Sequence, residues 1–259
     1  MNYECIRYEK EGSIATVTIH RPEARNALNS QVRAELFDAL SDAASDRDIR
    51  GVILTGGQEV FSGGADIKAM AESSPVDMLF QKETTRRVVN LIETMPKPVI
   101  ASISGFALGG GCELALACDV RVASETAQMG LPEIRLGIIP GGGGTQRLSR
   151  LIGMSRAKDM IFSGKIINAE EAYRIGLVDE VVPVDQLDGA AQKKMQGYLR
   201  HGAVALAAAK TAITTGANVD LYSGDSVEKL CFSLLFSTED QKEGMQAFID
   251  KRKAEFKGK

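Results

Sequence analysis

The stretch PKPVIASISGFALGGGCELALACDVRVAS, residues 96–124, decides the fold of this chain. Within it, PVIASIS predicts a buried strand behind a proline, GGGCELALAC predicts a short helix, and DVRVAS predicts another strand. This alternation of strand and helix is typical of a sheet covered by helices. The segments on either side extend the same pattern.

Upstream, the chain begins with a predicted hairpin. In SIATVTIH, residues 13–20, apolar side chains alternate with polar ones, which is the period of a half-buried strand. Residues 3–8 can pair with it through the turn at Glu11-Gly12. GVILTG, residues 51–56, predicts a further buried strand, and the helix after FSGGADIKAM is expected to end near Met95.

Two helical stretches are marked by their apolar spacing. Asn29 or Ser30 can cap a helix that follows the hairpin, and the chain is mostly helical past Thr145. The first stretch has apolar residues every four positions, at Val32, Leu36, Leu40 and Ala44. The last stretch has a 3.6-residue period through Met245, Phe248, Ile249, Arg252 and Phe256.

The composition is that of an ordinary soluble protein. The chain has 259 residues, 25% of them charged, and a net charge of -3, without the basic excess that nucleic acid or anionic membrane favours. This length suits one large α/β domain, or a domain with a small appendage. We find no signal peptide and no membrane span in the sequence.

The cysteines and histidines argue against a disulfide scaffold and a metal site. Four cysteines without C-x-x-C spacing predict reduced thiols in a cytoplasmic protein. His20 and His201 lie far apart in sequence and outside any H-E-x-x-H motif, so neither predicts a metal ligand. The sequence also lacks the glycine motifs of dinucleotide sites, phosphate loops and serine hydrolases.

Glycine gathers in two windows, residues 51–64 with five and residues 105–144 with ten of the 26. Glycine is needed where backbone approaches another group closely, so these windows are where backbone N–H groups should contact a ligand. Gly110, at a helix entry, and Ala65, after Gly63 and Gly64, could each donate an N–H to a developing oxyanion. Close packing of helices through small residues is the alternative explanation.

Two glutamates, Glu113 and Glu133, lie within the second window. Glu113 falls nearly one helical turn after Gly110, so its carboxylate can lie over the group that the Gly110 N–H contacts. Two carboxylates held beside one water could move its protons. Exposed helix glutamates are the alternative, and Asp66 is expected to be a first-turn helix acid.

Taken together, FSGGADIKAM, the segment 96–124 and LPEIRLGIIPGGGGTQRLSRLIG closely resemble the enoyl-CoA hydratase, or crotonase, family. The likeness runs from RPEARNAL, residues 21–28, to FSTEDQKEGMQAFIDKRK, residues 236–253. It implies an α/β fold with a spiral of repeated ββα units over residues 1–195 and a helical region over 196–259 that builds trimers or hexamers. It also implies a place in acyl-CoA and fatty acid metabolism, such as β-oxidation.

The resemblance also implies roles for individual residues. Ala65 and Gly110 would bind the thioester carbonyl of an acyl-CoA, Glu113 would act mainly on the water, and Glu133 would deliver a proton to C2. No cofactor is implied beyond the coenzyme A of the substrate. The residues implied to bind CoA or the acyl group are Ala24, Arg25, Gly63, Asp66, Ile67 and Gly141, with Phe248 and Lys251 reaching CoA in a neighbouring subunit.

Family members that hydrate a double bond carry both glutamates, whereas isomerases usually keep only the second. The sequence therefore predicts an enoyl-CoA hydratase, with a lyase or isomerase for branched or cyclic acyl-CoA as the alternative. Leu131 and Ser62-Gly63 depart from the residues of some relatives. A binding protein for RNA is a further alternative, but FQKETTRRVVNLIETM, residues 80–95, mixes cations with glutamates as a solvated helix face does.

Overall fold

The computed structural model of the chain describes residues 3–259, apart from the side chains of residues 80–84. A six-stranded sheet forms its centre, in the order β1-β2-β3-β4-β6-β9. The first two strands are antiparallel and each later neighbour is parallel. The strands are β1 (Ile6–Glu11), β2 (Ile14–Ile19), β3 (Gly51–Thr55), β4 (Val99–Ile103), β6 (Val120–Ser124) and β9 (Glu180–Val182).

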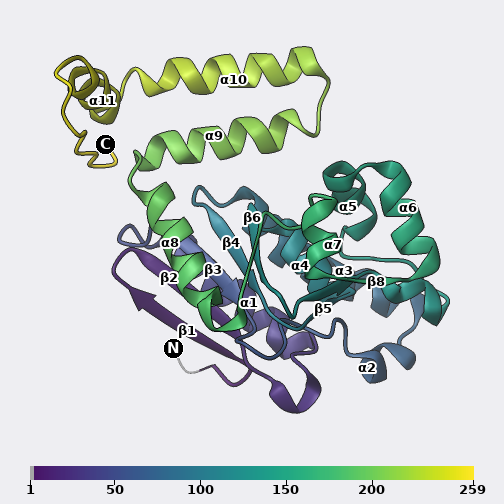
Figure 1. Cartoon of the computed structure of the whole chain (residues 1–259). Helices are drawn as coiled ribbons and strands as arrows, with labels where there is room; N and C mark the ends of the chain where they lie inside the picture. The colour runs from purple at the N-terminus through teal and green to yellow at the C-terminus, as the bar shows by residue number, and fades with distance from the viewer. Residues whose placement is uncertain (1–2) are drawn as a thin grey trace.

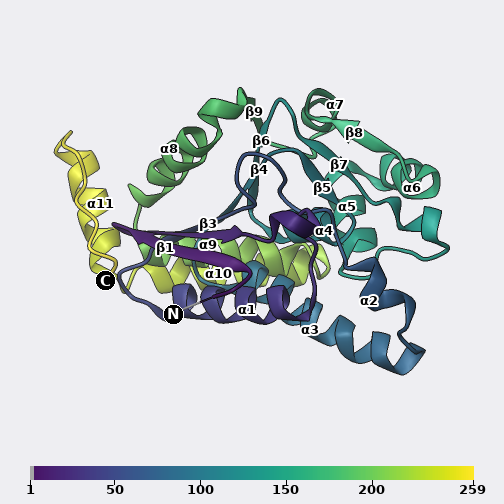
Figure 2. The same ribbon diagram turned by 90° about the horizontal axis from the view of Figure 1, so that it is seen from below.

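Helices cover both faces of this sheet (Figure 2). One face packs on α1 (Ser30–Ser45) and α3 (Pro75–Thr94), and the other on α8 (Leu187–Leu199). The predicted hairpin and first helix are confirmed, although the first strand covers Ile6–Glu11 and not residues 3–8. Ile6 pairs with Ile19, and the Asn29 side chain caps α1 by accepting from the Val32 N–H at 2.8 Å. The period of the sequence therefore predicted which strand face is buried.

A smaller sheet orders the strands β5-β7-β8. Its strands are β5 (Phe106–Leu108), β7 (Gln128–Gly130) and β8 (Ile166–Asn168), and a single bridge adds Ser62 beside Ala107. Thus β3, β4 and β6 of the large sheet are each followed by a short piece of the small sheet and then by a helix, which repeats a ββα unit. The helices that follow are α2 (Ile67–Ala71), α4 (Gly110–Ala117) and α5 (Gly144–Ile152).

The remaining elements complete the core and extend from it. Three 3₁₀ helices and two α-helices belong to the part of the chain before α8: η1 (Pro22–Ala24), η2 (Pro132–Leu136), η3 (Val184–Gln186), α6 (Met154–Ser163) and α7 (Ala169–Arg174). Beyond α8, the chain forms α9 (Ala203–Gly216), α10 (Leu221–Leu235) and α11 (Glu239–Ile249). Figure 1 shows α9 and α10 as an antiparallel pair that projects away from the sheets, with α11 at its end. Residue 195 lies within α8, a helix that packs on the large sheet. The division into a core of residues 1–195 and a helical region of residues 196–259 therefore stays a prediction.

The periodicity through Phe256 was misleading, because α11 ends at Ile249. Lys251 has a left-handed φ of 54°, which turns the chain back. The returning tail is held by the Asp240 carboxylate, which accepts from the N–H groups of Lys257 at 2.6 Å and Gly258 at 2.9 Å. Phe256 therefore packs on the side of α11, near Gly244, instead of extending the helix.

All four cysteines are free thiols. Cys112 and Cys118 on and after α4 are buried in the core. Among the described residues, none of the helices combines the length and apolar character needed to cross a membrane.

Candidate active site

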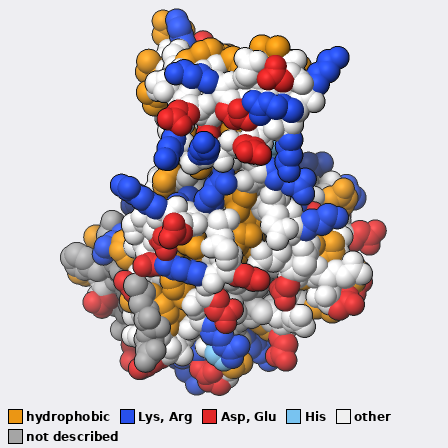
Figure 3. Space-filling model, turned by 90° about the vertical axis from the view of Figure 1, so that its left-hand side faces the viewer, with side chains coloured by type: hydrophobic (Ala, Val, Ile, Leu, Met, Phe, Trp, Pro, Cys, Tyr) orange, Lys and Arg blue, Asp and Glu red, His pale blue; other side chains and the backbone are white. Residues whose placement is uncertain are grey.

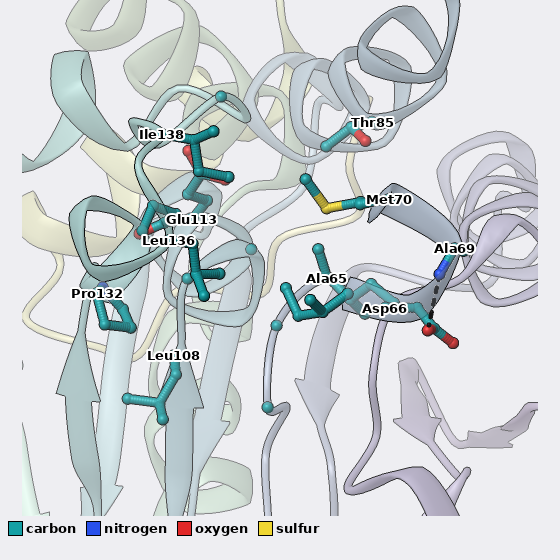
Figure 4. A pocket seen from close by; sticks show the side chains of 18 of the residues that line it. Ala65, Asp66, Ala69, Met70, Thr85, Leu108, Glu113, Pro132, Leu136 and Ile138 are labelled. Atoms are coloured by element: carbon teal, nitrogen blue, oxygen red, sulfur yellow. Dashed lines mark hydrogen bonds between the residues drawn. The ribbon is translucent and has the colours of Figure 1, made fainter. Parts of the chain in front are cut away.

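A cavity of about 220 Å³ lies between the helices α1, α2, α3 and α4, beside the end of β5 and the η2 segment. Its wall combines backbone of residues 63–65 and 109–110 with the carboxylates of Glu113 and Glu133. Apolar side chains complete the wall, among them Met70, Leu136 and Ile138, which Figure 4 shows around the same space. The cavity thus presents hydrogen-bonding groups within a mostly apolar enclosure, as small-molecule sites do.

Glu113 is held firmly by backbone. It lies on α4 with 3% of its surface exposed, and its Oε1 accepts from the N–H groups of Gly142 at 2.6 Å and Gly144 at 2.8 Å. Gly144 is the first residue of α5, so the positive end of that helix also faces this oxygen. These contacts fix one oxygen of the carboxylate and leave the other to act on a ligand.

Glu133 approaches the same helix start from another segment. It lies in η2, and its Oε1 is 3.2 Å from the point where a Cβ on Gly109 would stand. Gly109 has a φ of 51°, which favours glycine, so the chain turns tightly there and leaves room for the carboxylate. Both glutamates therefore line one cavity at the beginning of α4.

The backbone N–H groups of Ala65 and Gly110 come together between these segments. A Cβ on Gly110 would stand 3.6 Å from the Ala65 nitrogen, and one on Gly64 would stand 3.5 Å from the Gly110 nitrogen. Gly110 is the first residue of α4, where an N–H lacks an intrahelical partner. The Leu28 N–H fixes the neighbouring loop by donating to the Gly64 oxygen at 2.7 Å. Such a pair of donors suits a carbonyl oxygen that gains negative charge.

The other predicted site residues are divided between two places. Gly63, Asp66, Ile67 and Gly141 line the cavity. Ala24 and Arg25 lie at η1 outside its wall, although the Arg25 oxygen accepts from the Gly63 N–H at 2.8 Å.

Phe248 and Lys251 lie far from the cavity within one chain. Phe248 belongs to α11 and Lys251 follows it, at the opposite end of the molecule from α2 in Figure 1. Phe248 is 86% exposed. Neither residue can contribute to the cavity of its own chain, so their implied role stays tied to a neighbouring subunit.

Asp66 differs from its expected position, because it is the N-cap of α2 and not a residue of the first turn. Its carboxylate accepts from Arg21 Nη1 at 3.0 Å and from the Ala69 N–H at 3.5 Å. The hydrogen bond from Arg21 holds the pKa of Asp66 below its usual range. Asp66 therefore fixes the start of α2 beside the Ala65 N–H.

The sequence did not predict the two backbone N–H groups that hold the Glu113 carboxylate. In GGGGTQRL, residues 141–148, the sequence predicted a role only for Gly141, whereas Gly142 and Gly144 supply the two N–H groups described above. The position of Gly142 and Gly144 in the second glycine-rich window was the signal that could have indicated this role. The apolar wall from Met70, Leu136 and Ile138 was also missed, since single apolar residues carry no motif.

The structure bears on two other kinds of site, a metal centre and an RNA-binding helix. Within the described part of the chain, no three His, Cys, Asp or Glu side chains come together as ligands for a metal ion. In the helix considered for RNA, the Arg87 guanidinium lies 4.3 Å from the centre of the Phe37 ring, and Glu93 pairs with Arg147. The side chains of Lys82 and Glu83 lie outside the described residues.

Comparisons with known proteins agree over nearly the whole chain. The sequence pattern of the Enoyl-CoA hydratase/isomerase family matches residues 9–259. The chain is 45% identical to the crotonyl-CoA hydratase of Syntrophomonas wolfei over 99% of both chains. It is 46% identical to the short-chain-enoyl-CoA hydratase of Clostridium acetobutylicum over 95% of both.

A solved enoyl-CoA hydratase from Bacillus anthracis superimposes with a TM-score of 0.94 at 40% identity, covering 99% of this chain and 100% of that one. The predicted fold class is thereby confirmed. A match of this extent, in sequence and in structure, establishes that the chain belongs to the enoyl-CoA hydratase/isomerase family.

Proposed function

We propose that the protein is an enoyl-CoA hydratase, a hydro-lyase that reversibly adds water to a trans-2-enoyl-CoA and gives the 3-hydroxyacyl-CoA. The observation that carries this proposal is the meeting of two carboxylates, Glu113 and Glu133, with two N–H groups around one cavity. The likeness to relatives named as enoyl-CoA hydratases supports the same reaction.

In the proposed mechanism, the N–H groups of Ala65 and Gly110 bind the oxygen of the thioester carbonyl. Polarisation of the carbonyl makes C3 electrophilic, and the two donors stabilise the enolate charge that develops on oxygen as water adds. Each donor contributes about 3 kcal/mol to the transition state. A single donor would leave the carbonyl poorly oriented.

The carboxylates then divide the two protons of the reaction. Glu113 takes a proton from the water as the oxygen of that water bonds to C3, and Glu133, which starts in its protonated form, gives its proton to C2. Passage of the proton from Glu113 to Glu133 then restores both groups. The position of Glu113 supports this division, because two N–H donors hold one oxygen of its carboxylate and leave the other to accept a proton. Gly141 lines the cavity beside Glu113 and helps to place the water. The reaction needs no cofactor beyond the CoA of the substrate.

The CoA moiety is assigned to the outer end of the site. Ala24, Arg25, Gly63, Asp66 and Ile67 would contact it from the same chain. Phe248 and Lys251 would reach it from a neighbouring copy in a trimer or a dimer of trimers. Their distance from the cavity of their own chain and the exposure of Phe248 support this arrangement. We assign the protein to the cytoplasm, which the four free thiols support.

Loss of enoyl absorbance from crotonyl-CoA and longer enoyl-CoAs, with product analysis by mass spectrometry, tests the proposal. Hydration adds one water to the product, whereas isomerisation does not. Glu113→Gln and Glu133→Gln should each lower kcat by about 10²- to 10⁴-fold. Glu170→Gln, at an exposed position on α7, is the matched control. Inactive wild-type protein would overturn the proposed reaction, and full activity of both site variants would overturn the assignment of the site.

A further inference from the structure

The loop that holds Glu113 has a second side, which faces away from the cavity. There the Arg147 side chain, from the first turn of α5, donates through Nη1 to the Gly142 oxygen at 3.2 Å. Its Nη2 donates to Glu93 Oε2, from the last turn of α3, at 2.7 Å. The guanidinium therefore links the loop of residues 142–144 to α3, a helix from a distant part of the sequence.

The oxygen that accepts from Arg147 belongs to the central peptide of the loop that holds Glu113. The Gly142 oxygen belongs to the peptide between Gly142 and Gly143, whereas the two N–H groups that hold Glu113 belong to the peptides immediately before and after it. This central peptide joins the two peptides that carry the donors. A hydrogen bond to its oxygen therefore holds in place the segment from which both N–H groups reach Glu113.

A run of four glycines cannot fix such a geometry by itself, because glycine has wide conformational freedom. Gly143 has a φ of 104°, and a Cβ there would lie 2.0 Å from Arg147 Nη1. The guanidinium therefore packs directly against the loop, in space that only glycine leaves open. The rigidity that the loop lacks is supplied from outside by the arginine.

Glu93 and Arg147 lie outside the lining of the cavity proposed to bind substrate. They line a separate cavity of about 850 Å³, and Gly141 lines both this cavity and the smaller one that contains Glu113. Neither Glu93 nor Arg147 is among the described residues that line the smaller cavity. A change in this pair should therefore alter the chemical step and leave substrate binding as it was.

We propose that Arg147, oriented by Glu93, is a positioning residue for the reaction, which fixes the 142–144 loop and through it the aim of the Glu113 carboxylate. The inference rests on the function proposed above for Glu113. Its chemistry is that of a planar guanidinium, which can bond a carboxylate and a carbonyl at once in a fixed fork. A lysine at this position would be a poor substitute.

The test compares Arg147→Met and Glu93→Gln with Arg150→Met. Arg150 lies on the same helix and bonds to Gln146, so its loss removes the same charge without touching the loop. Arg147→Met should lower kcat by about 10- to 100-fold, the loss expected when a reacting group is displaced by about 1 Å. Glu93→Gln should lower it less, and KM should change in neither. Arg150→Met should match wild type.

A double-mutant cycle separates positioning from a general structural role. In the Glu113→Gln background, Arg147→Met should have no further effect on kcat, because the group that it positions is already disabled. Equal effects in both backgrounds, or full activity of Arg147→Met, would overturn the inference. A crystal structure of Arg147→Met in which Glu113 still accepts from both amides would overturn it too, whatever the activity. Inactive wild-type protein would instead count against the proposed reaction.

Discussion

Gly142 is the residue on which the geometry of Glu113 depends most directly. An added Cβ would lie 2.6 Å from Glu113 Oε2 and 3.0 Å from its Cδ, inside normal contact distance. We expect Gly142→Ala to displace the carboxylate and to lower kcat for crotonyl-CoA by about 100-fold, because a misplacement near 1 Å costs that much. Steady-state kinetics on the folded variant, verified by circular dichroism, would measure the loss.

The matched control is Gly189→Ala on α8. Apart from its chain neighbours and the nearby backbone of its own helix, no described atom lies within 4 Å of the Cβ that this change would add. Alanine within a helix is preferred over glycine, so this variant should keep full activity and gain up to about 1 kcal/mol of stability. Equal kinetics for the two alanine variants would contradict the role given to Gly142.

Cys112 and Cys118 should resist chemical modification in the folded protein. Both side chains are buried, and burial raises the pKa of the Cys112 thiol strongly and that of Cys118 to about 12. The reactive thiolate is therefore scarce at pH 8, and access is blocked as well. Iodoacetamide labelling followed by mass spectrometry should find these two residues modified only after denaturation. Rapid labelling in the native state would contradict the packing described for α4.

The sequence predicted the chemical groups of the site more readily than their supports. Glu113 and Glu133 stood out because glycine surrounded them. Gly142 and Gly144 could not be assigned to Glu113, because contacts between segments about 30 residues apart follow no spacing rule. Asp66 was placed one position too far into its helix, and helix ends are where sequence patterns are least exact.

At the scale of elements, long periodic segments were predicted well and short ones were not. The alternation in β2 and the cap of α1 follow from local rules, and both are as expected. The strands of the small sheet have three residues each, too few to display a period. The end of α11 depends on Asp240, which binds a tail far along the chain, so the local apolar pattern could not reveal it.

The Lys210 side chain holds α9 against the core. Its Nζ donates to the oxygens of Ile92 at 2.8 Å and Lys97 at 3.0 Å, and to Asp119 Oδ2 at 2.8 Å. The lysine side chain is only 10% exposed. Lys210→Met would leave Asp119 and two carbonyl groups without this partner, at a cost of about 3 kcal/mol. Urea denaturation followed by circular dichroism would measure the change, and limited proteolysis should show earlier cleavage around α9.

The partly exposed ion pair between Lys194 and Glu180 provides the comparison for Lys210. Their side chains are 24% and 39% exposed, so Lys194→Met should cost only about 0.5 kcal/mol. If both methionine variants unfold at the same urea concentration, Lys210 does not fasten α9 in the way described.

At the scale of the whole molecule, the C-terminal helices are too apolar for a surface that faces water alone. The exposed side chains of α10 and its ends include Leu221 at 89%, Leu230 at 72% and Leu234 at 66%. Figure 3 shows hydrophobic side chains among charged ones on the lobe that these helices form. Apolar patches of this kind mark contacts between proteins. They support the proposed trimer or dimer of trimers, in which each copy would cover the helices of another.

The oligomer can be tested by adding charge to that surface. Leu230→Asp with Leu234→Asp places two carboxylates one helical turn apart on α10, where each buried leucine would contribute about 1.5–3 kcal/mol to an interface. Light scattering should then give a mass near the 27.8 kDa of one chain, against a multiple of three for wild type. Since Phe248 and Lys251 are proposed to reach a neighbour's CoA, the dissociated variant should also have a raised KM for enoyl-CoA. Ser233→Asp adds the same kind of charge at an exposed polar position and should remain assembled. A wild-type protein that is monomeric at micromolar concentration would overturn the assembly and the role of Phe248 and Lys251 together.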